Sequence, residues 1–199
     1  GQWLALKLAH ADQAVTLLAR NETLRSLQEH GIRLLDAPTG DRLTARVPLV
    51  DRLDPQDEYD LVVVALSRAN RLAVCPILAR NENLKHVLFM GNDVSGFQRY
   101  LNHLPAAKVL LGFPGAGGGY VDGELVIQDR DKPRGKGEVY LGELDGATRD
   151  RTRQIAAMSP VRYASSQSRC PCMTIRRAPR RPRSNRTLSP LPSTPSRAG

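Results

Sequence analysis

Two positions among the first twenty residues have a type and a spacing that could hold a phosphorylated ligand. Gly1 opens an apolar segment, and Arg20 follows a second apolar run, residues 14–18. In a nucleotide-binding βαβ unit a glycine opens the first helix, and about twenty residues later a group after the second strand contacts the adenosine ribose. An acid there would select a 2′-hydroxyl, whereas an Arg offers paired donors to a 2′-phosphate. Gly1 and Arg20 therefore predict a dinucleotide site that favours NADP.

A helix and a strand must separate these two residues. The apolar segment from Trp3 to His10 predicts the helix, and residues 14–18 predict a buried strand. The same order of residues also fits any amphipathic helix that precedes a buried strand, because short motifs of this kind match by chance. The rest of the chain has to decide between the two interpretations.

Three later apolar runs predict the strands of a parallel sheet: Leu61 to Leu66, His86 to Met90 and Lys108 to Phe113. The first run is rich in valine, which is typical of a central strand covered by helices on both faces. Two helical segments separate the runs, Arg71 to Arg80 and Phe97 to Leu104, with Pro76 interrupting the first and Pro105 ending the second. This alternation predicts an α/β fold with a Rossmann-like, doubly wound, mostly parallel sheet whose first strand is missing.

Polar loops follow two of these strands at the ends where open α/β sheets bind ligands. Ser67 and Arg68 come after the first strand, and the sequence GNDVSG, residues 91–96, comes after the second. Both loops are predicted to border the ligand. The glycines of GAGGG, residues 115–119, resemble a phosphate-binding loop, but a strand-like segment and not a helix follows them, so a flexible turn is the favoured interpretation.

Shorter elements are predicted between and after these segments. Asn21 is expected to cap a helix that Gly31 ends, and residues 32–50 are expected to form a β-hairpin outside the main sheet. Residues 124–128 and 139–146 predict further strand, and residues 147–158 predict an amphipathic helix that ends at Pro160.

Composition divides the chain into a neutral body, residues 1–158, and a basic tail, residues 159–199. The tail holds nine of the 29 basic residues, none of the 20 acidic residues and half of the 14 prolines. It cannot bury enough apolar surface to offset its chain entropy, so it is predicted to be disordered. A basic tail could bind nucleic acid through phosphate contacts, but Tyr163 is its single aromatic residue and stacking groups are lacking, which makes this partner the weaker alternative.

The cysteine and histidine content favours neither a disulfide framework nor a metal site. Three cysteines give no paired spacing, and the four histidines flank predicted helices and strands without an evident catalytic partner, so no metal or catalytic role is assigned to them. No run approaches the roughly 18 apolar residues of a membrane span. The expected setting is cytoplasmic, and the sequence leaves the oligomeric state open.

Several segments together resemble the N-terminal domain of the ketopantoate reductases. In order they are GQWLALKLA, VTLLAR, YDLVVVAL, VLFMGND, VLLGFPGAGG and LGELDG. The resemblance implies a Rossmann-like domain that binds NADPH, with reduction of a 2-keto acid as the activity of the family. It implies that Gly1 opens the nucleotide loop, that Arg20 contacts the 2′-phosphate, and that Asn92, or Gly91, lies beside the nicotinamide and the substrate.

The sequence departs from that family at two further places. The family has a Lys after its fourth strand where this chain has Ser67, with Arg68 next along the chain, and nothing after Met158 resembles its helical second domain. That domain supplies the catalytic Lys and the substrate-binding acid. We therefore expect the chain to be a fragment or the product of a shifted reading frame, with little or no turnover. The alternative is a non-catalytic module that binds a nucleotide or a partner protein.

Overall fold

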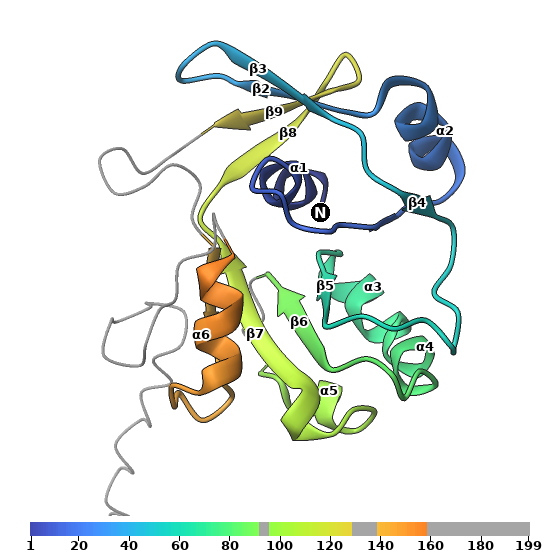
Figure 1. Ribbon diagram of the computed structural model, residues 1–199, viewed down its shortest axis with the longest axis vertical. Coiled ribbons are helices and arrows are strands. Elements are labelled where there is room, and N and C mark those ends of the chain that lie inside the picture. The colour runs from blue at the N-terminus through green and yellow to red at the C-terminus, as the bar shows by residue number, and fades with distance from the viewer. Residues whose placement is uncertain (92–95, 129–138, 159–199) are drawn as a thin grey trace, which may run out of the picture.

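The structure is a computed structural model that describes residues 1–91, 96–128 and 139–158. In this part of the chain two four-stranded sheets lie on either side of one helix, α1 (Gln2–Ala9), as Figure 1 shows. The predicted helix from Trp3 to His10 is confirmed. We call the sheet drawn above α1 the upper sheet and the one drawn below it the lower sheet. The side chains of α1 pack on both, and Leu6 is fully buried in the cluster that includes Leu34 of the upper sheet and Leu110 of the lower sheet.

The lower sheet contains the three predicted parallel strands. Its order is β10-β7-β6-β5, with β5, β6 and β7 parallel and β10 antiparallel to β7. The strands span β5 (Leu61–Val64), β6 (His86–Met90), β7 (Val109–Pro114) and β10 (Val139–Gly142). The α/β class with a parallel core is thus confirmed. We call the edge where β5, β6 and β7 end the carboxyl edge, and the opposite one the amino edge.

The position of β5 differs from the prediction. It was expected in the centre of the sheet, but it pairs only with β6 and lies at the end of the strand order. A valine-rich run indicates burial on both faces, and it does not report how many neighbouring strands form hydrogen bonds. The predicted strand 14–18 is reduced to β1 (Leu17–Leu18), which pairs in parallel with β4 (Leu49–Val50) and not with β5.

The helices after β5 and β6 are shorter than expected. The predicted helix 71–80 is two helices, α3 (Arg68–Ala73) and α4 (Cys75–Ala79), and Pro76 lies in the first turn of α4, where a proline costs no hydrogen bond. The second predicted helix is only α5 (Gln98–Leu101). Pro105 disfavours helical backbone at Leu104, the residue before it, and is the N-cap of a short 3-10 turn, η1 (Ala106–Lys108).

Helix α2 (Asn21–His30) ends as predicted and begins differently. Gly31 follows it with a φ of +67°, and a Cβ there would lie 2.8 Å from the Ala45 carbonyl oxygen, so glycine is required. At the other end the predicted cap was wrong: Arg20 is the extended N-cap residue, and Asn21 is the first residue of α2, with a φ of +52°. Asn21 takes the left-handed conformation that asparagine tolerates better than most residues.

The upper sheet has the order β3-β2-β9-β8. The hairpin of β2 (Ile32–Asp36) and β3 (Asp41–Ala45) and the strand β9 (Glu124–Gln128) are confirmed. The turn predicted at residues 115–119 was wrong for residues 117–119, because β8 (Gly117–Val121) includes these three glycines and pairs antiparallel with β9, whereas Gly115 before the strand lies in a bend. A Cβ on Gly118 would collide with the Val126 carbonyl oxygen, so these glycines permit close pairing of two backbones.

The last described element, α6 (Asp150–Ala157), lies beside β7 in Figure 1 and contacts β10. Ile155 of this helix is buried in the same core as α1. Among the helices that the structure describes, none is both long and apolar enough to cross a bilayer. The predicted disorder of residues 159–199 concerns a segment outside the described residues.

Candidate functional site

The N-terminus of α1 lies against the carboxyl edge of the lower sheet. A Cβ built on Gly1 would be 3.8 Å from the Cβ of Ala65, the residue directly after β5 (Figure 1). The eight-residue α1 therefore directs its unpaired backbone N–H groups toward the strand ends. Such a helix end favours an anion, because its free N–H groups and its dipole both face the ligand.

Arg20 lies where β1 passes into α2, and its side chain is exposed. Its Nε donates a 3.0 Å hydrogen bond to the Asp51 carbonyl oxygen, which fixes the direction of the guanidinium. The two terminal nitrogens bond to no other described residue. The residue before it is the buried Ala19, so no acid from these two positions competes for the cation. The guanidinium is thus held on one side and open to a bidentate anion on the other.

Ser67 and Arg68 both lie on the carboxyl edge. Ser67 is the N-cap residue of α3 but its hydroxyl makes no capping hydrogen bond, and Arg68 is the first residue of that helix. Both side chains are exposed. Asn92 lies outside the described residues, while the adjacent Gly91 directly follows β6 on the same edge. The fold therefore brings Gly1, Ser67 and Arg68 to one edge, and Arg20 to the end of β1.

Arg71, which the sequence analysis did not select as a site residue, is a buried cation on this edge. It is 4% exposed, and its side chain lies against Gly91, whose φ is +135°. A Cβ on Gly91 would be 3.1 Å from Nη2 and 3.2 Å from both Cζ and Nη1. Because these three distances are nearly equal, Gly91 covers the flat face of the guanidinium, and the N–H groups point elsewhere, in the guanidinium plane.

The N–H groups of Arg71 have no acceptor in the described part of the chain. Its side chain forms no hydrogen bond or ion pair with another described residue, and Nε is buried without a partner.

One sequence signal could have identified Arg71 as a site residue. Arg71 is four residues after Ser67 on α3, and helical side chains point back toward the N-terminus of their helix, here the strand ends.

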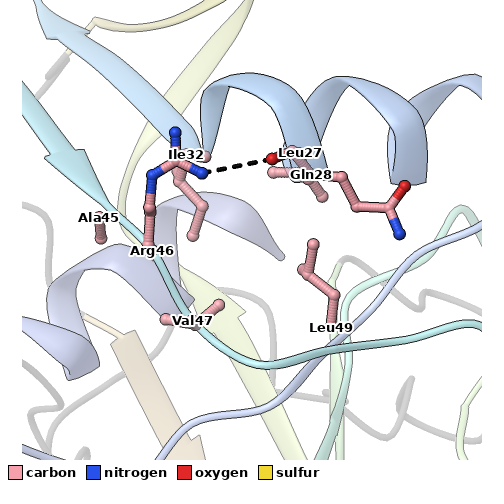
Figure 2. Close-up of a pocket in the computed structure, with 8 residues that line it drawn as sticks. Leu27, Gln28, Ile32, Ala45, Arg46, Val47 and Leu49 are labelled. Carbon is pink, nitrogen blue, oxygen red and sulfur yellow. Dashed lines mark hydrogen bonds between the residues drawn. The ribbon is translucent and has the colours of Figure 1, made fainter.

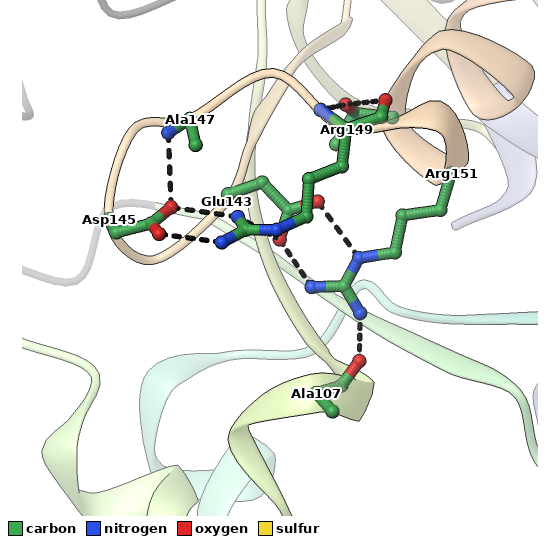
Figure 3. A network of polar contacts seen from close by, with 7 residues as sticks. Ala107, Glu143, Asp145, Ala147, Arg149 and Arg151 are labelled. Atoms are coloured by element: carbon green, nitrogen blue, oxygen red, sulfur yellow. Dashed lines mark hydrogen bonds and ion pairs between the residues drawn. The ribbon is translucent and has the colours of Figure 1, made fainter.

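A second buried charge, Glu143, lies at the amino edge, because β10 runs antiparallel to β7. Its side chain is 1% exposed and contacts two arginines, Arg149 at 3.4 Å and Arg151 through two hydrogen bonds (Figure 3). Arg151 also donates to the Ala107 carbonyl oxygen, and Arg149 makes two hydrogen bonds to Asp145. The hydrogen bonds and charge of Arg149 hold the pKa of Asp145 well below its ordinary value. This network fastens α6 to the sheet.

Three titratable side chains of types that can donate a proton in a reductase lie at the amino edge. His86 begins β6, and Lys85 and Lys108 precede β6 and β7. Burial, and secondly the charge of Arg151, lower the pKa of His86, while its Nδ1 has no hydrogen-bond partner. These three groups therefore lie a full strand length away from the carboxyl edge.

The predicted site does not coincide with the pocket beside α2. A pocket of about 340 Å³ lies between α2 and the upper sheet and includes Leu27, Ile32 and Leu49 (Figure 2). The guanidinium of Arg46 beside it is occupied, since it donates to the carbonyl oxygens of Gln28 and Glu29 at the end of α2. Within the described ranges no group of three or more His, Cys, Asp or Glu side chains could hold a metal ion.

Comparisons of the sequence with protein families and with single proteins indicate the same family. The model of the family described as ketopantoate reductase PanE/ApbA matches residues 1–146. A 2-dehydropantoate 2-reductase of Halobacterium salinarum is 28% identical over 151 residues, covering 75% of this chain. The chain spans about half the length of that relative, 48%.

Solved structures agree on the fold. A 2-dehydropantoate 2-reductase from Geobacter metallireducens GS-15 superposes with a TM-score of 0.65 at 18% identity, covering 81% of this chain and 54% of the other. A ternary structure of D-mandelate dehydrogenase with NADH and anilino(oxo)acetate gives 0.64 at 16% identity, covering 81% and 53%. Because the family model matches well over half of the residues, the resemblance stated from the sequence is confirmed: the chain belongs to the ketopantoate reductase family.

Proposed function

We propose that residues 1–158 form the nucleotide-binding part of a reductase that uses NADPH to convert a 2-keto acid into a 2-hydroxy acid. One observation carries the proposal: the open N-terminus of α1 faces the carboxyl edge of a parallel sheet, where such sheets bind dinucleotides. The family and the names of its relatives support the class of reaction. Cysteine usage supports a reducing, cytoplasmic setting, since the described Cys75 is a free, buried thiol.

The residues that are present fit a dinucleotide. A Cβ at Gly1 would only touch Ala65, so a pyrophosphate group could approach the first turn of α1, whose N–H groups would hold it. Arg20 would bind a 2′-phosphate with its free terminal nitrogens, and this contact would make the site prefer NADPH to NADH. Ser67, Arg68 and Asn92 are proposed to border the nicotinamide end. When bound, the reduced nicotinamide supplies the hydride.

We propose further that the chain alone has little turnover. Hydride addition to a ketone needs a proton donor beside the forming alkoxide. In the described part of the chain, Lys85, His86 and Lys108 all lie at the amino edge and cannot reach a ligand at the carboxyl edge. We therefore expect this chain to bind a nucleotide without reducing a 2-keto acid at a measurable rate.

The test is a titration of the full chain with NADPH and, in parallel, NADH. Trp3 is buried in α1, two residues from Gly1, so its fluorescence can report the binding. We expect tighter binding of NADPH, and Arg20→Ala should weaken NADPH by about tenfold or more while leaving NADH nearly unchanged. Arg25→Ala is the matched control, because Arg25 lies further along α2, is exposed and pairs only with Glu22.

The outcomes separate the proposal from its alternatives. Equal affinity for both nucleotides, unaffected by Arg20→Ala, would remove the assigned preference for NADPH. A folded chain that binds neither nucleotide would exclude the nucleotide-binding function. Rapid oxidation of NADPH in the presence of a 2-keto acid would instead show that a proton donor exists in this chain and would contradict the low turnover.

A further inference from the structure

Arg71, the buried cation at the carboxyl edge, is enclosed in a way that favours binding of an anionic ligand. Arg71 is 4% exposed and one face of its guanidinium is covered by Gly91. The guanidinium is therefore not hydrated in the way that a surface arginine is. An arginine cannot escape this situation by losing its proton. Any partner must therefore be an acceptor that reaches the edge of the guanidinium plane.

The described chain does not provide that acceptor. Nε is buried and unpartnered, and no carboxylate among the described residues pairs with the guanidinium. Glu143, the buried carboxylate, is at the opposite edge and already has two arginines. A buried charge without a partner costs several kcal/mol, so Arg71 destabilises the fold unless an acceptor compensates its charge.

We infer that Arg71 is an oxyanion-binding residue of the nucleotide site, which receives a phosphate or carboxylate group of the bound ligand on the free edge of its guanidinium. The position of Arg71 supports this inference. Its guanidinium packs against Gly91, the residue after β6, on the sheet edge that α1 faces. A planar fork fits either oxyanion through two parallel hydrogen bonds. This inference rests on the proposed function, of which it names one further contact.

The glycine at position 91 is part of the same arrangement. Its φ of +135° is unfavourable for other residues, and a side chain there would meet the guanidinium at 3.1 to 3.2 Å. Glycine thus lets the cation lie flat against the strand end. Arg68, the neighbouring cation on α3, is exposed and lacks this enclosure.

The experiment measures thermal stability of the full chain, without nucleotide, against two simple oxyanions. Inorganic pyrophosphate represents the phosphates of a dinucleotide, and 2-oxobutyrate represents the carboxylate of a 2-keto acid. The variants are Arg71→Met, which keeps the aliphatic stem, and Arg71→Lys, which keeps the charge without the fork. Arg80→Met is the matched control, because Arg80 is exposed after α4 and away from the carboxyl edge.

We expect one of the two oxyanions to raise the melting temperature of the wild type, with an apparent affinity at least about tenfold weaker in Arg71→Met and partly retained in Arg71→Lys. Dependence on pyrophosphate assigns the contact to a phosphate, and dependence on 2-oxobutyrate assigns it to the substrate carboxylate. Without any ligand, Arg71→Met should melt no lower than the wild type, since it removes an unpaired buried charge.

Two results would overturn the inference: no stabilisation of the wild type by either oxyanion, or equal responses in the wild type and folded Arg71→Met. An oxyanion response that depends on Arg71 in a chain that binds no NADPH would preserve this site while excluding the proposed function.

Discussion

Two buried charges lie at opposite edges of the same parallel sheet, and their surroundings differ. At the amino edge Glu143 is enclosed by Arg149 and Arg151, so its charge is compensated within the chain (Figure 3). At the carboxyl edge Arg71 is equally buried but has no acceptor among the described residues. A compensated buried ion holds elements together, whereas an uncompensated one marks where a charged ligand can bind.

The largest effect on stability is expected at the amino edge, when the charge of Glu143 is removed. Glu143→Gln leaves two arginines facing a neutral, buried side chain, and we expect the free energy of unfolding to fall by about 2–4 kcal/mol. Urea unfolding followed by circular dichroism measures it. Asp150→Asn is the control, because it removes an exposed pair with Arg153 and an exposed charge in the first turn of α6, and it should change stability by less than about 1 kcal/mol.

A further variant checks the interpretation of this first result. Replacing Glu143 and Arg151 together by methionine removes both charges, so much of the lost stability should return. If Glu143→Gln alone were as stable as the wild type, the network would not fasten α6, and the contrast between the two edges would fail.

An intermediate effect is expected at the uncompensated side. Arg71→Met keeps the packing of the aliphatic stem and removes a charge that has no described partner, so the free energy of unfolding should stay level or rise by up to about 1 kcal/mol. The same urea experiment measures it. A loss comparable to that of Glu143→Gln would show that both buried charges are structural.

The smallest effect concerns pH at the amino edge. Burial and the charge of Arg151 lower the pKa of His86 from its ordinary 6.5, so the unfolded chain takes up a proton before the folded chain does. Stability should therefore decrease as the pH falls through 6.5 toward the folded pKa. His86→Leu should flatten this part of a melting-temperature profile, whereas His103→Leu, at an exposed position, should not. Parallel profiles for the wild type and His86→Leu would contradict the lowered pKa.

The local elements were predictable because short-range patterns determine them. An apolar period predicted α1, glycine predicted the end of α2, and Pro76 predicted the division between α3 and α4. The parallel strands β5, β6 and β7 followed from continuous apolar runs, and their carboxyl ends were the expected ligand edge. Family membership also came from the order of these segments, since it depends on the chain itself.

Only the tertiary structure decided how distant segments pair and which charges become buried. The glycines of β8 look like a turn in sequence, but their role depends on the approach of β9, and β5 lies at a sheet end because β1 pairs with β4. Likewise, Arg71 and Glu143 are ordinary surface types in the sequence. Their burial, and the presence of partners for Glu143 alone, arise from contacts between residues far apart in the chain, which no local pattern reports.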